Sequence, residues 1–146
     1  MKSSQASVIV LTPVYEDQMV FRTLLSELKT AIPTGLYVVA VDDGSVIHPL
    51  TIEAHQQAGI TGAVASLKRN VGHQRAISAG LRCVAEHIRA EQTLVIMDSD
   101  GEDTPTDIRA LLAALGPTDV DVAVAKRANR TEGLMFKAFY FLYKLL

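Results

Sequence analysis

Short apolar runs rich in β-branched residues alternate with segments of helical periodicity along almost the whole chain. The run at 7–13, SVIVLTP, has no polar alternation, which is typical of a strand buried on both faces of a sheet. The segment at 16–32 then repeats apolar residues with a helical period and is ended by Pro33. Because strand–helix–strand units pair in parallel through right-handed crossovers, the pattern predicts an α/β fold with a mainly parallel central sheet.

The same pattern gives the expected order of elements. Strands are expected at 7–13, 36–45, 62–70, 93–98 and 121–127, and helices at 16–32, 49–58, 73–90 and 104–115. In the last of these helices Thr104 is the expected N-cap, and Pro105 follows at the first helical position. A chain of 146 residues suffices for one core, so we expect a single domain over 1–146.

Charge and cysteine content exclude several classes of protein. The formal net charge is −2, with 14 basic and 16 acidic residues, which argues against nucleic acid as the main partner. The single cysteine, Cys83, cannot form an intrachain disulfide and suits a reducing compartment. The sequence has no apolar run of the roughly 18 residues that span a bilayer. These features indicate a cytoplasmic globular domain.

The sequence ends in a strongly apolar stretch. Of residues 134–146, only Lys137 and Lys144 are charged, and both fall on one side of a helix expected at about 133–146. The apolar faces of this helix fit either a membrane surface or a missing C-terminal segment of the same protein. We favour packing against such a segment, and we therefore expect a C-terminally truncated form of a longer protein.

Acidic residues gather where the fourth predicted strand ends. In open parallel sheets, ligands bind beyond the carboxyl ends of the strands. Asp98 and Asp100 are two apart, so on an extended segment they point the same way, and Glu102 continues the alternation. Three converging carboxylates suit Mg²⁺ or Mn²⁺, which would offset their repulsion and carry a diphosphate. A solvated acidic turn is the alternative interpretation.

The second predicted strand also ends in carboxylates. In VDDGS, Asp42 and Asp43 either accept hydrogen bonds from a nucleobase or ribose or form a plain turn around Gly44.

Two other nucleotide-related folds fit less well. A dinucleotide-binding dehydrogenase needs G-x-G-x-x-G after the first strand, where this chain reads TPVYED. A flavodoxin-like or response-regulator domain explains an acidic cluster but has no place for RNVGH.

Basic side chains follow the third and fifth predicted strands. Arg69 and His73 flank a glycine turn at a predicted helix start, where cations and backbone amides bind anionic oxygens. A helix cap or a plain loop is the alternative there. Arg127 and Arg130 are three apart in KRANR, and they form either a solvated edge or a diphosphate clamp. Arginine matches phosphate geometry in a bidentate manner, which favours the clamp.

Five stretches together resemble the family 2 glycosyltransferases with the GT-A fold, in order and in spacing. They are VIVLTPVYED, VVAVDDGS, KRNVGHQRAISAG, LVIMDSDGEDTP and AVAKRANR. The most similar branch acts on polyprenyl phosphates and includes dolichol-phosphate mannosyltransferase and the bactoprenol glucosyltransferases. The resemblance covers roughly residues 7–143 and is specific, because five ordered motifs match rather than one. It implies a Rossmann-like GT-A sandwich that forms the nucleotide-sugar-binding part of a catalytic domain.

This resemblance implies roles for the matching positions. It implies that Pro13, Tyr15, Glu16, Asp42, Asp43 and Asp98 bind the nucleotide sugar, and the glycine turn described above adds Arg69 and His73 to this expected set. The expected metal ligands are Asp98, Asp100 and Glu102, and the expected catalytic residues are Asp100, Arg127 and Arg130. Glu102 stands where this branch usually has glutamine, and Gly101 replaces a usual leucine.

The implied reaction is inverting transfer of a sugar from a UDP- or GDP-sugar to a polyprenyl phosphate. Mg²⁺ or Mn²⁺ would neutralise the departing diphosphate. A phosphate acceptor is already anionic and needs no general base, and none is obvious after residue 130. The full-length protein is expected at the cytoplasmic face of the membrane. The alternative is a domain that binds nucleotide but is catalytically incomplete without its C-terminal acceptor part.

Overall fold

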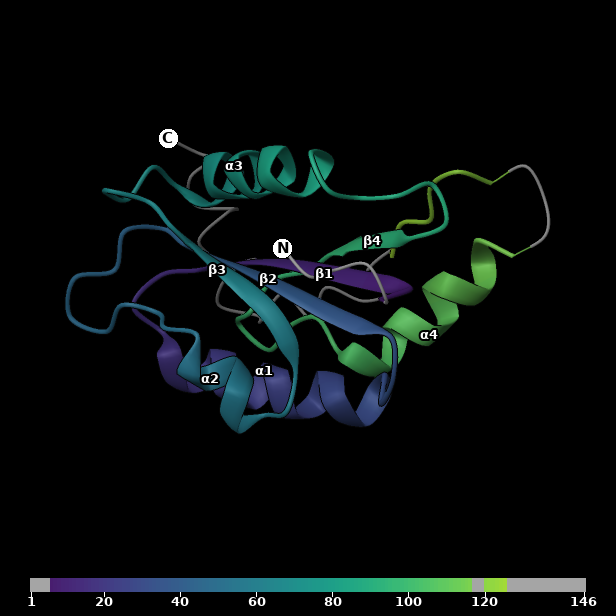
Figure 1. Ribbon diagram of the computed structural model, residues 1–146, viewed down its shortest axis with the longest axis horizontal. Helices are drawn as coiled ribbons and strands as arrows, with labels where there is room; N and C mark the ends of the chain where they lie inside the picture. Colours follow the sequence, from purple (N-terminus) through teal and green to yellow (C-terminus); the bar gives the residue numbers. More distant parts are fainter. Residues whose placement is uncertain (1–5, 117–119, 126–146) are drawn as a thin grey trace, which may run out of the picture.

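The chain forms a parallel sheet with helices on both faces (Figure 1). The computed structural model describes residues 6–116 and 120–125. Its strands are β1 (Val8–Val14), β2 (Leu36–Asp42), β3 (Thr61–Ser66) and β4 (Thr93–Ile96). Its helices are α1 (Gln18–Ala31), α2 (Glu53–Gln57), α3 (His73–Ala85) and α4 (Pro105–Ala114). The predicted α/β class with a parallel sheet is confirmed, because every strand pair in the described residues is parallel.

The sheet order is β3-β2-β1-β4, so the chain winds outward from β1 in both directions. Figure 1 shows α3 above the sheet and α1, α2 and α4 below it. All seven residues of β1 are buried. Val8 and Val10 contribute to the core beneath α1, and Ile9 and Leu11 contribute to the core beneath α3. The unbroken apolar run in the sequence is therefore explained by a strand that needs apolar side chains on both faces.

Several element boundaries differ from those predicted. The second helix begins at Glu53 rather than at 49, because the amide of Leu50 donates to the Asp42 carboxylate at 2.9 Å and keeps the preceding loop out of the helix. The third strand ends at Ser66 rather than at 70, and α3 ends at Ala85 rather than at 90. Thr104 occupies the predicted N-cap position, with Pro105 first in α4, but its hydroxyl donates to the Asp107 carboxylate at 2.6 Å and makes no side-chain capping bond to the backbone.

The strand predicted at 121–127 is wrong over 121–125, where the chain has no regular structure. Val122 and Val124 are 74% and 82% exposed. Alternating valines specify one face of a strand, but a strand also needs a neighbouring edge to pair with, and the periodicity does not supply one. Residues 126–127 and the helix predicted at about 133–146 lie outside the described residues. Across 6–116 and 120–125, no helix has the length and hydropathy needed to cross a membrane.

His55 is a fully buried titratable side chain of α2. Its Nε2 donates to the Val38 carbonyl at 3.1 Å, and its ring lies 5.4 Å from that of Phe21. On β3, Gly62 makes room for the ring, since a Cβ there would collide with the imidazole and with the Val38 carbonyl. Nδ1 has no hydrogen-bond partner among the described residues. Burial lowers the pKa of His55 below the usual 6.5, and the bond to Val38 only partly opposes this.

The lowered pKa of His55 makes stability depend on pH. The unfolded chain takes up a proton at a higher pH than the fold does, so the free energy of unfolding falls as pH drops below about 6.5. We expect chemical denaturation between about pH 7.5 and pH 5.5 to show this loss, and His55→Gln to flatten the slope. His87→Gln, in the exposed turn after α3, is the control and should keep this slope. Equal slopes in wild type and His55→Gln would contradict the assignment.

Candidate functional site

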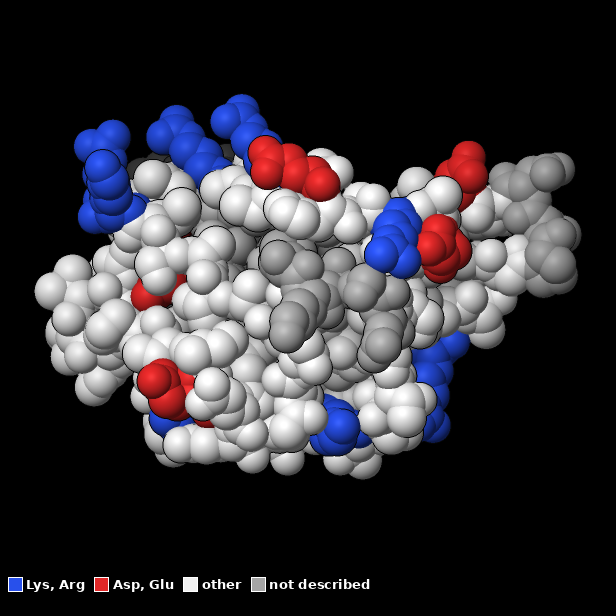
Figure 2. Space-filling model, viewed as in Figure 1, with Lys and Arg blue, Asp and Glu red and all other residues white. Residues whose placement is uncertain are grey.

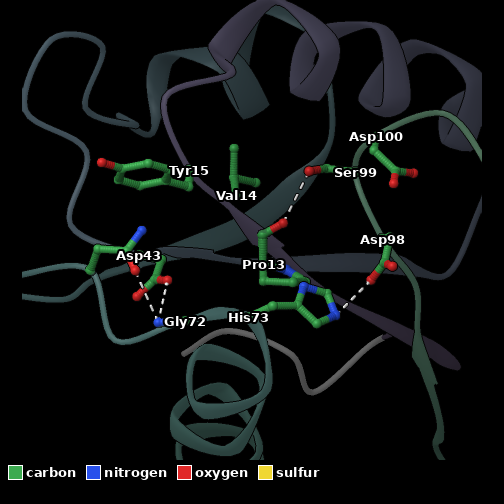
Figure 3. A pocket seen from close by; sticks show the side chains of 10 residues that line it. Pro13, Val14, Tyr15, Asp43, Gly72, His73, Asp98, Ser99 and Asp100 are labelled. Carbon is green, nitrogen blue, oxygen red and sulfur yellow. Dashed lines mark hydrogen bonds and ion pairs between the residues drawn. The ribbon is translucent and has the colours of Figure 1, made fainter. Parts of the chain in front are cut away.

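An open cavity of about 300 Å³ lies beyond the carboxyl ends of β1, β2 and β4, beside the start of α3 (Figure 3). Its lining residues are Pro13, Val14, Tyr15, Asp43, Asn70, Gly72, His73, Asp98, Ser99 and Asp100. Since β1 lies between β2 and β4, this is the edge at which the winding reverses. The edge of the sheet predicted for ligand binding therefore carries a cavity.

The two sides of the cavity differ in chemistry. Figure 3 shows Tyr15 and Asp43 on one side and Asp98 and Asp100 on the other. Tyr15 is 51% exposed, so its ring is available to a ligand. The β1 end is tied to the β4 exit by Ser99, whose Oγ donates to the Pro13 carbonyl at 3.0 Å. The cavity thus has an aromatic side and a doubly acidic side held at fixed separation.

Asp43 is a buried carboxylate that holds the start of α3. It is 3% exposed, and its oxygens accept from the amides of Val71 at 2.8 Å and Gly72 at 3.0 Å. The turn that carries it packs backbone against backbone, because a Cβ at Gly44, where φ is +76°, would collide with Arg69. Negative charge next to the first turn of a helix is favourable. Asp43 therefore joins β2 to α3 and also borders the cavity.

Asp42 is bound to its own loop rather than to the cavity. It is 2% exposed, and its oxygens accept from the amides of Ser45 and Leu50, each at 2.9 Å. This is the Asx-type turn that the sequence left open as an alternative. The structure therefore separates the two adjacent carboxylates, since Asp43 lines the cavity and Asp42 does not.

Glu16 also points away from the cavity, and it joins the β1 loop to the β2 loop. Its amide donates to Ser45 Oγ at 2.8 Å. Its carboxylate accepts from the amides of Val46, Ile47 and His48, the last at 2.9 Å. The backbone amide of Val46 lowers the pKa of Glu16 most, against an opposing effect of burial. We call this set of contacts the Glu16 latch.

The latch holds Glu16 in an unusual backbone conformation. Its backbone φ angle is +53°, a left-handed value that residues other than glycine rarely adopt. The bonds to residues 46–48 and to Ser45 offset that strain. Tyr15 immediately precedes Glu16, so the latch also fixes the backbone from which the exposed ring projects into the cavity. These contacts join residues about thirty positions apart, and no local sequence signal announces them.

The acidic segment after β4 turns earlier than expected. Asp100 Oδ1 accepts from the Glu102 amide at 2.9 Å, and Gly101 has a φ of +82°. The extended alternation therefore ends at Asp100, and Glu102 does not line the cavity. Asp103 accepts from the Asp98 amide at 3.0 Å. In the described part of the chain, no group of three or more His, Cys, Asp or Glu side chains is arranged to hold a metal ion.

Asp98 and Asp100 nonetheless present two carboxylates to one cavity. Mg²⁺ commonly binds through one or two carboxylates and completes its shell with water and substrate phosphates. The donor chemistry of this pair fits such an ion. Asp98 Oδ1 also lies 3.2 Å from His73 Nε2, an ion pair when the histidine is protonated, which fixes the orientation of this carboxylate (Figure 3).

The predicted basic residues have different outcomes. His73 lines the cavity, whereas Arg69 is exposed and is not part of the lining. Arg127 and Arg130 lie outside the described residues. Among the lining residues that were not predicted, Asn70 accepts from the Gly72 amide at 3.0 Å within the RNVGH motif. The RNVGH motif was the signal that could have identified Asn70 and Gly72 as lining residues, because it places them at the turn into α3.

Most of the chain is similar to known proteins. Residues 9–140 match the model of glycosyl transferase family 2. A dodecaprenyl-phosphate galacturonate synthase of Rhizobium johnstonii is 26% identical over 142 residues, which cover 93% of this chain and 40% of that protein.

Solved structures share the fold. S. aureus TarS 1–349 in complex with UDP-GlcNAc has a TM-score of 0.56 and 25% identity, covering 74% of this chain and 30% of that one. The mannosyltransferase PcManGT from Pyrobaculum calidifontis, in complex with GDP-Man and Mn²⁺, has a TM-score of 0.53 and 21% identity, covering 73% and 31%. The chain thus spans less than half the length of each of these proteins, at 40%, 30% and 31%. The predicted GT-A fold is confirmed by these neighbours.

Loss of the Glu16 carboxylate should open the latch. We expect Glu16→Ala to speed hydrogen exchange at the amides of residues 46–48, because their acceptor is removed, while the β1 and β2 amides stay protected. Glu27→Ala, an exposed carboxylate of α1, is the matched control and should change none of them. Unchanged exchange at residues 46–48 in Glu16→Ala would show that the latch does not order this loop.

Proposed function

The chain belongs to glycosyl transferase family 2, and we propose that it is the nucleotide-sugar-binding part of an inverting glycosyltransferase with a polyprenyl-phosphate acceptor. The observation that carries the proposal is the cavity, where Tyr15 and Asp43 face Asp98 and Asp100 across the carboxyl edge of the sheet. An aromatic side suits a base, and an acidic side suits a cation that accompanies a diphosphate. We place the full-length protein at the cytoplasmic face of a membrane, where such an acceptor is available.

The base and ribose would bind on the side of Tyr15 and Asp43. The exposed ring offers a flat apolar surface for stacking on a nucleobase. Each carboxylate oxygen can accept more than one hydrogen bond, and each Asp43 oxygen accepts one from the backbone amides of 71 and 72. Asp43 is thus able to accept a further bond from a ribose hydroxyl or a base N–H. The complex of TarS with UDP-GlcNAc, a structural neighbour, is consistent with a UDP-type donor.

The diphosphate would bind on the opposite side. Asp98 and Asp100 would hold Mg²⁺ or Mn²⁺, and the bound ion would neutralise charge on the departing nucleotide diphosphate. His73 orients Asp98, and the turn at Gly101 holds the Asp100 carboxylate at the cavity rim. Glu102, which does not line the cavity, is the least supported of the three proposed ligands.

A polyprenyl phosphate fits the proposed chemistry as acceptor. Its phosphate oxygen is anionic, so it can attack the anomeric carbon without a general base, and a single displacement inverts the configuration. The similarity to a dodecaprenyl-phosphate galacturonate synthase supports this acceptor class. Arg127 and Arg130 are proposed to contact the donor diphosphate and the acceptor phosphate, because arginine binds phosphate in a bidentate manner.

A second function is favoured by one observation. The chain spans only 40% of the galacturonate synthase, so it is also consistent with a domain that binds nucleotide without transferring sugar. Donor hydrolysis and transfer assays with UDP- and GDP-sugars separate the two. Nucleotide binding accompanied by turnover supports the transferase, and binding without turnover supports the incomplete domain.

Removing one carboxylate of the acidic pair should abolish the metal-dependent part of nucleotide affinity. We expect calorimetry to show tighter binding of UDP or GDP with Mn²⁺ than without it. Asp100→Asn should lose this gain, about tenfold or roughly 1.4 kcal/mol, because a carboxylate ligand of the proposed ion is replaced by a neutral amide. Glu27→Gln removes an equal charge from α1 and should keep the gain. If Asp100→Asn stays folded and binds as tightly as the wild type, the metal assignment is refuted.

A further inference from the structure

Half of the eight lysine and arginine side chains in residues 6–116 and 120–125 lie between positions 68 and 82. Residues 54–85 contain no Asp or Glu, although the whole chain has a net charge of −2. The same segment carries four exposed cationic side chains, Lys68, Arg69, Arg75 and Arg82. We call these four residues the basic face. Figure 2 shows a row of blue side chains along the top of the view, where Figure 1 places α3 and the loop that leads into it, with an acidic side chain beside the row and further blue side chains along the bottom.

Helix geometry places the arginines of α3 on the side away from the sheet. Arg75 and Arg82 are seven residues apart, so they lie on one side of α3, about 10 Å apart along its axis. The opposite side of the helix packs on the sheet through Ala76, Gly80 and Val84, all buried. Lys68 and Arg69 extend the charge into the loop before the helix. None of the four has a role in the core.

In the described part of the chain, the acidic residue nearest to these cations in sequence is the exposed Glu86, four positions after Arg82 at the end of α3. None of the four lies in an ion pair there, whereas Arg89, beyond the helix, pairs with Glu91 at 3.8 Å. Four like charges that share one surface repel one another, which slightly destabilises the fold. Their exposure leaves them available to an anionic partner.

We propose that the basic face lies against an anionic lipid bilayer. Each Lys or Arg near such a surface strengthens binding about fivefold, and the effect adds over a polybasic patch. The face borders the cavity, because α3 begins at His73, which lines it. Docking in this way would hold the cavity mouth next to the membrane. The proposal deepens the proposed function and rests on it for the source of the acceptor, a phosphate carried by a membrane lipid.

A nucleic acid fits this face less well. Proteins that bind single strands interleave cations with aromatic side chains on which bases stack, and residues 54–85 contain no Phe, Trp or Tyr. Duplex binders usually carry a net basic charge, and this chain carries −2. The face is also the outward side of a helix rather than a groove. A bilayer requires only a broad surface with a suitable charge.

A single exposed cysteine on α3 allows the contact with the bilayer to be measured by a fluorescent label. Cys83 is the single cysteine of the sequence, is exposed, and follows Arg82 on α3. The fluorescence of an environment-sensitive dye attached to Cys83 should change when α3 contacts vesicles of phosphatidylcholine with about one-third phosphatidylglycerol. We expect no response to phosphatidylcholine alone. The response should disappear near 1 M salt, where the screening length falls to about 3 Å.

Matched charge-removal variants test the face itself. Arg75→Ser/Arg82→Ser should lower partitioning onto the anionic vesicles roughly 25-fold, about fivefold per charge. Lys29→Gln/Arg109→Gln removes the same charge from α1 and α4, across the sheet, and should partition like the wild type. Equal losses in both double variants, or equal binding to neutral vesicles, would overturn the proposal. A response to single-stranded RNA but not to anionic vesicles would overturn it in favour of a nucleic acid.

The experiment separates this inference from the proposed function. Calorimetry with UDP or GDP on Arg75→Ser/Arg82→Ser should give wild-type affinity, because neither arginine lines the cavity. Charge-dependent vesicle binding by a chain that binds no nucleotide would refute the proposed function and keep the basic face. Nucleotide binding without vesicle binding would refute the basic face as a membrane contact and would leave the proposed function standing.

Discussion

Backbone amides at the carboxyl edge of the sheet hold buried or partly buried carboxylates, and the site depends on these contacts. All strands end at this edge, so several loops meet there with unpaired amides. Asp42, Asp43 and Glu16 accept from them and join the loops after β1, β2 and β3. A hydrogen bond to a buried charged group contributes about 1.5–3 kcal/mol, enough for Asp43 to fix the start of α3.

The acidic residues of this edge therefore divide into two groups with different surroundings. Asp42 and Glu16 are bound to loop amides and do not line the cavity, whereas Asp98 and Asp100 face it. Asp43 belongs to both groups. A frame of carboxylates fixed on amides can hold two further carboxylates at the rim of one cavity, where their like charges favour a cation. This gives a physical reason for so much negative charge beside buried strands.

The sequence was sufficient for the sheet and for the edge that carries the site, because apolar runs and strand–helix alternation place every carboxyl end together. It also identified Tyr15 and Asp98 by their positions after strands. It could not assign Glu16, whose partners are about thirty residues away and are amides rather than side chains. It did not predict the turn at Gly101, which ends the alternation and leaves Glu102 outside the cavity lining. The valines at 120–124 have strand periodicity, but pairing depends on a neighbouring edge.

Paramagnetic broadening by Mn²⁺ in the presence of UDP or GDP would show whether the cavity holds a cation and a nucleotide together. In a ¹⁵N-labelled chain, we expect the amide signals to broaden first around Asp98, Asp100 and the start of α3, where His73 lines the same cavity. The signals at the C-terminal end of α1, which leads back to the opposite edge of the sheet, should stay sharp at the same Mn²⁺ concentration. Broadening centred elsewhere, or broadening that does not depend on the nucleotide, would contradict a cavity built to hold a cation and a nucleotide together.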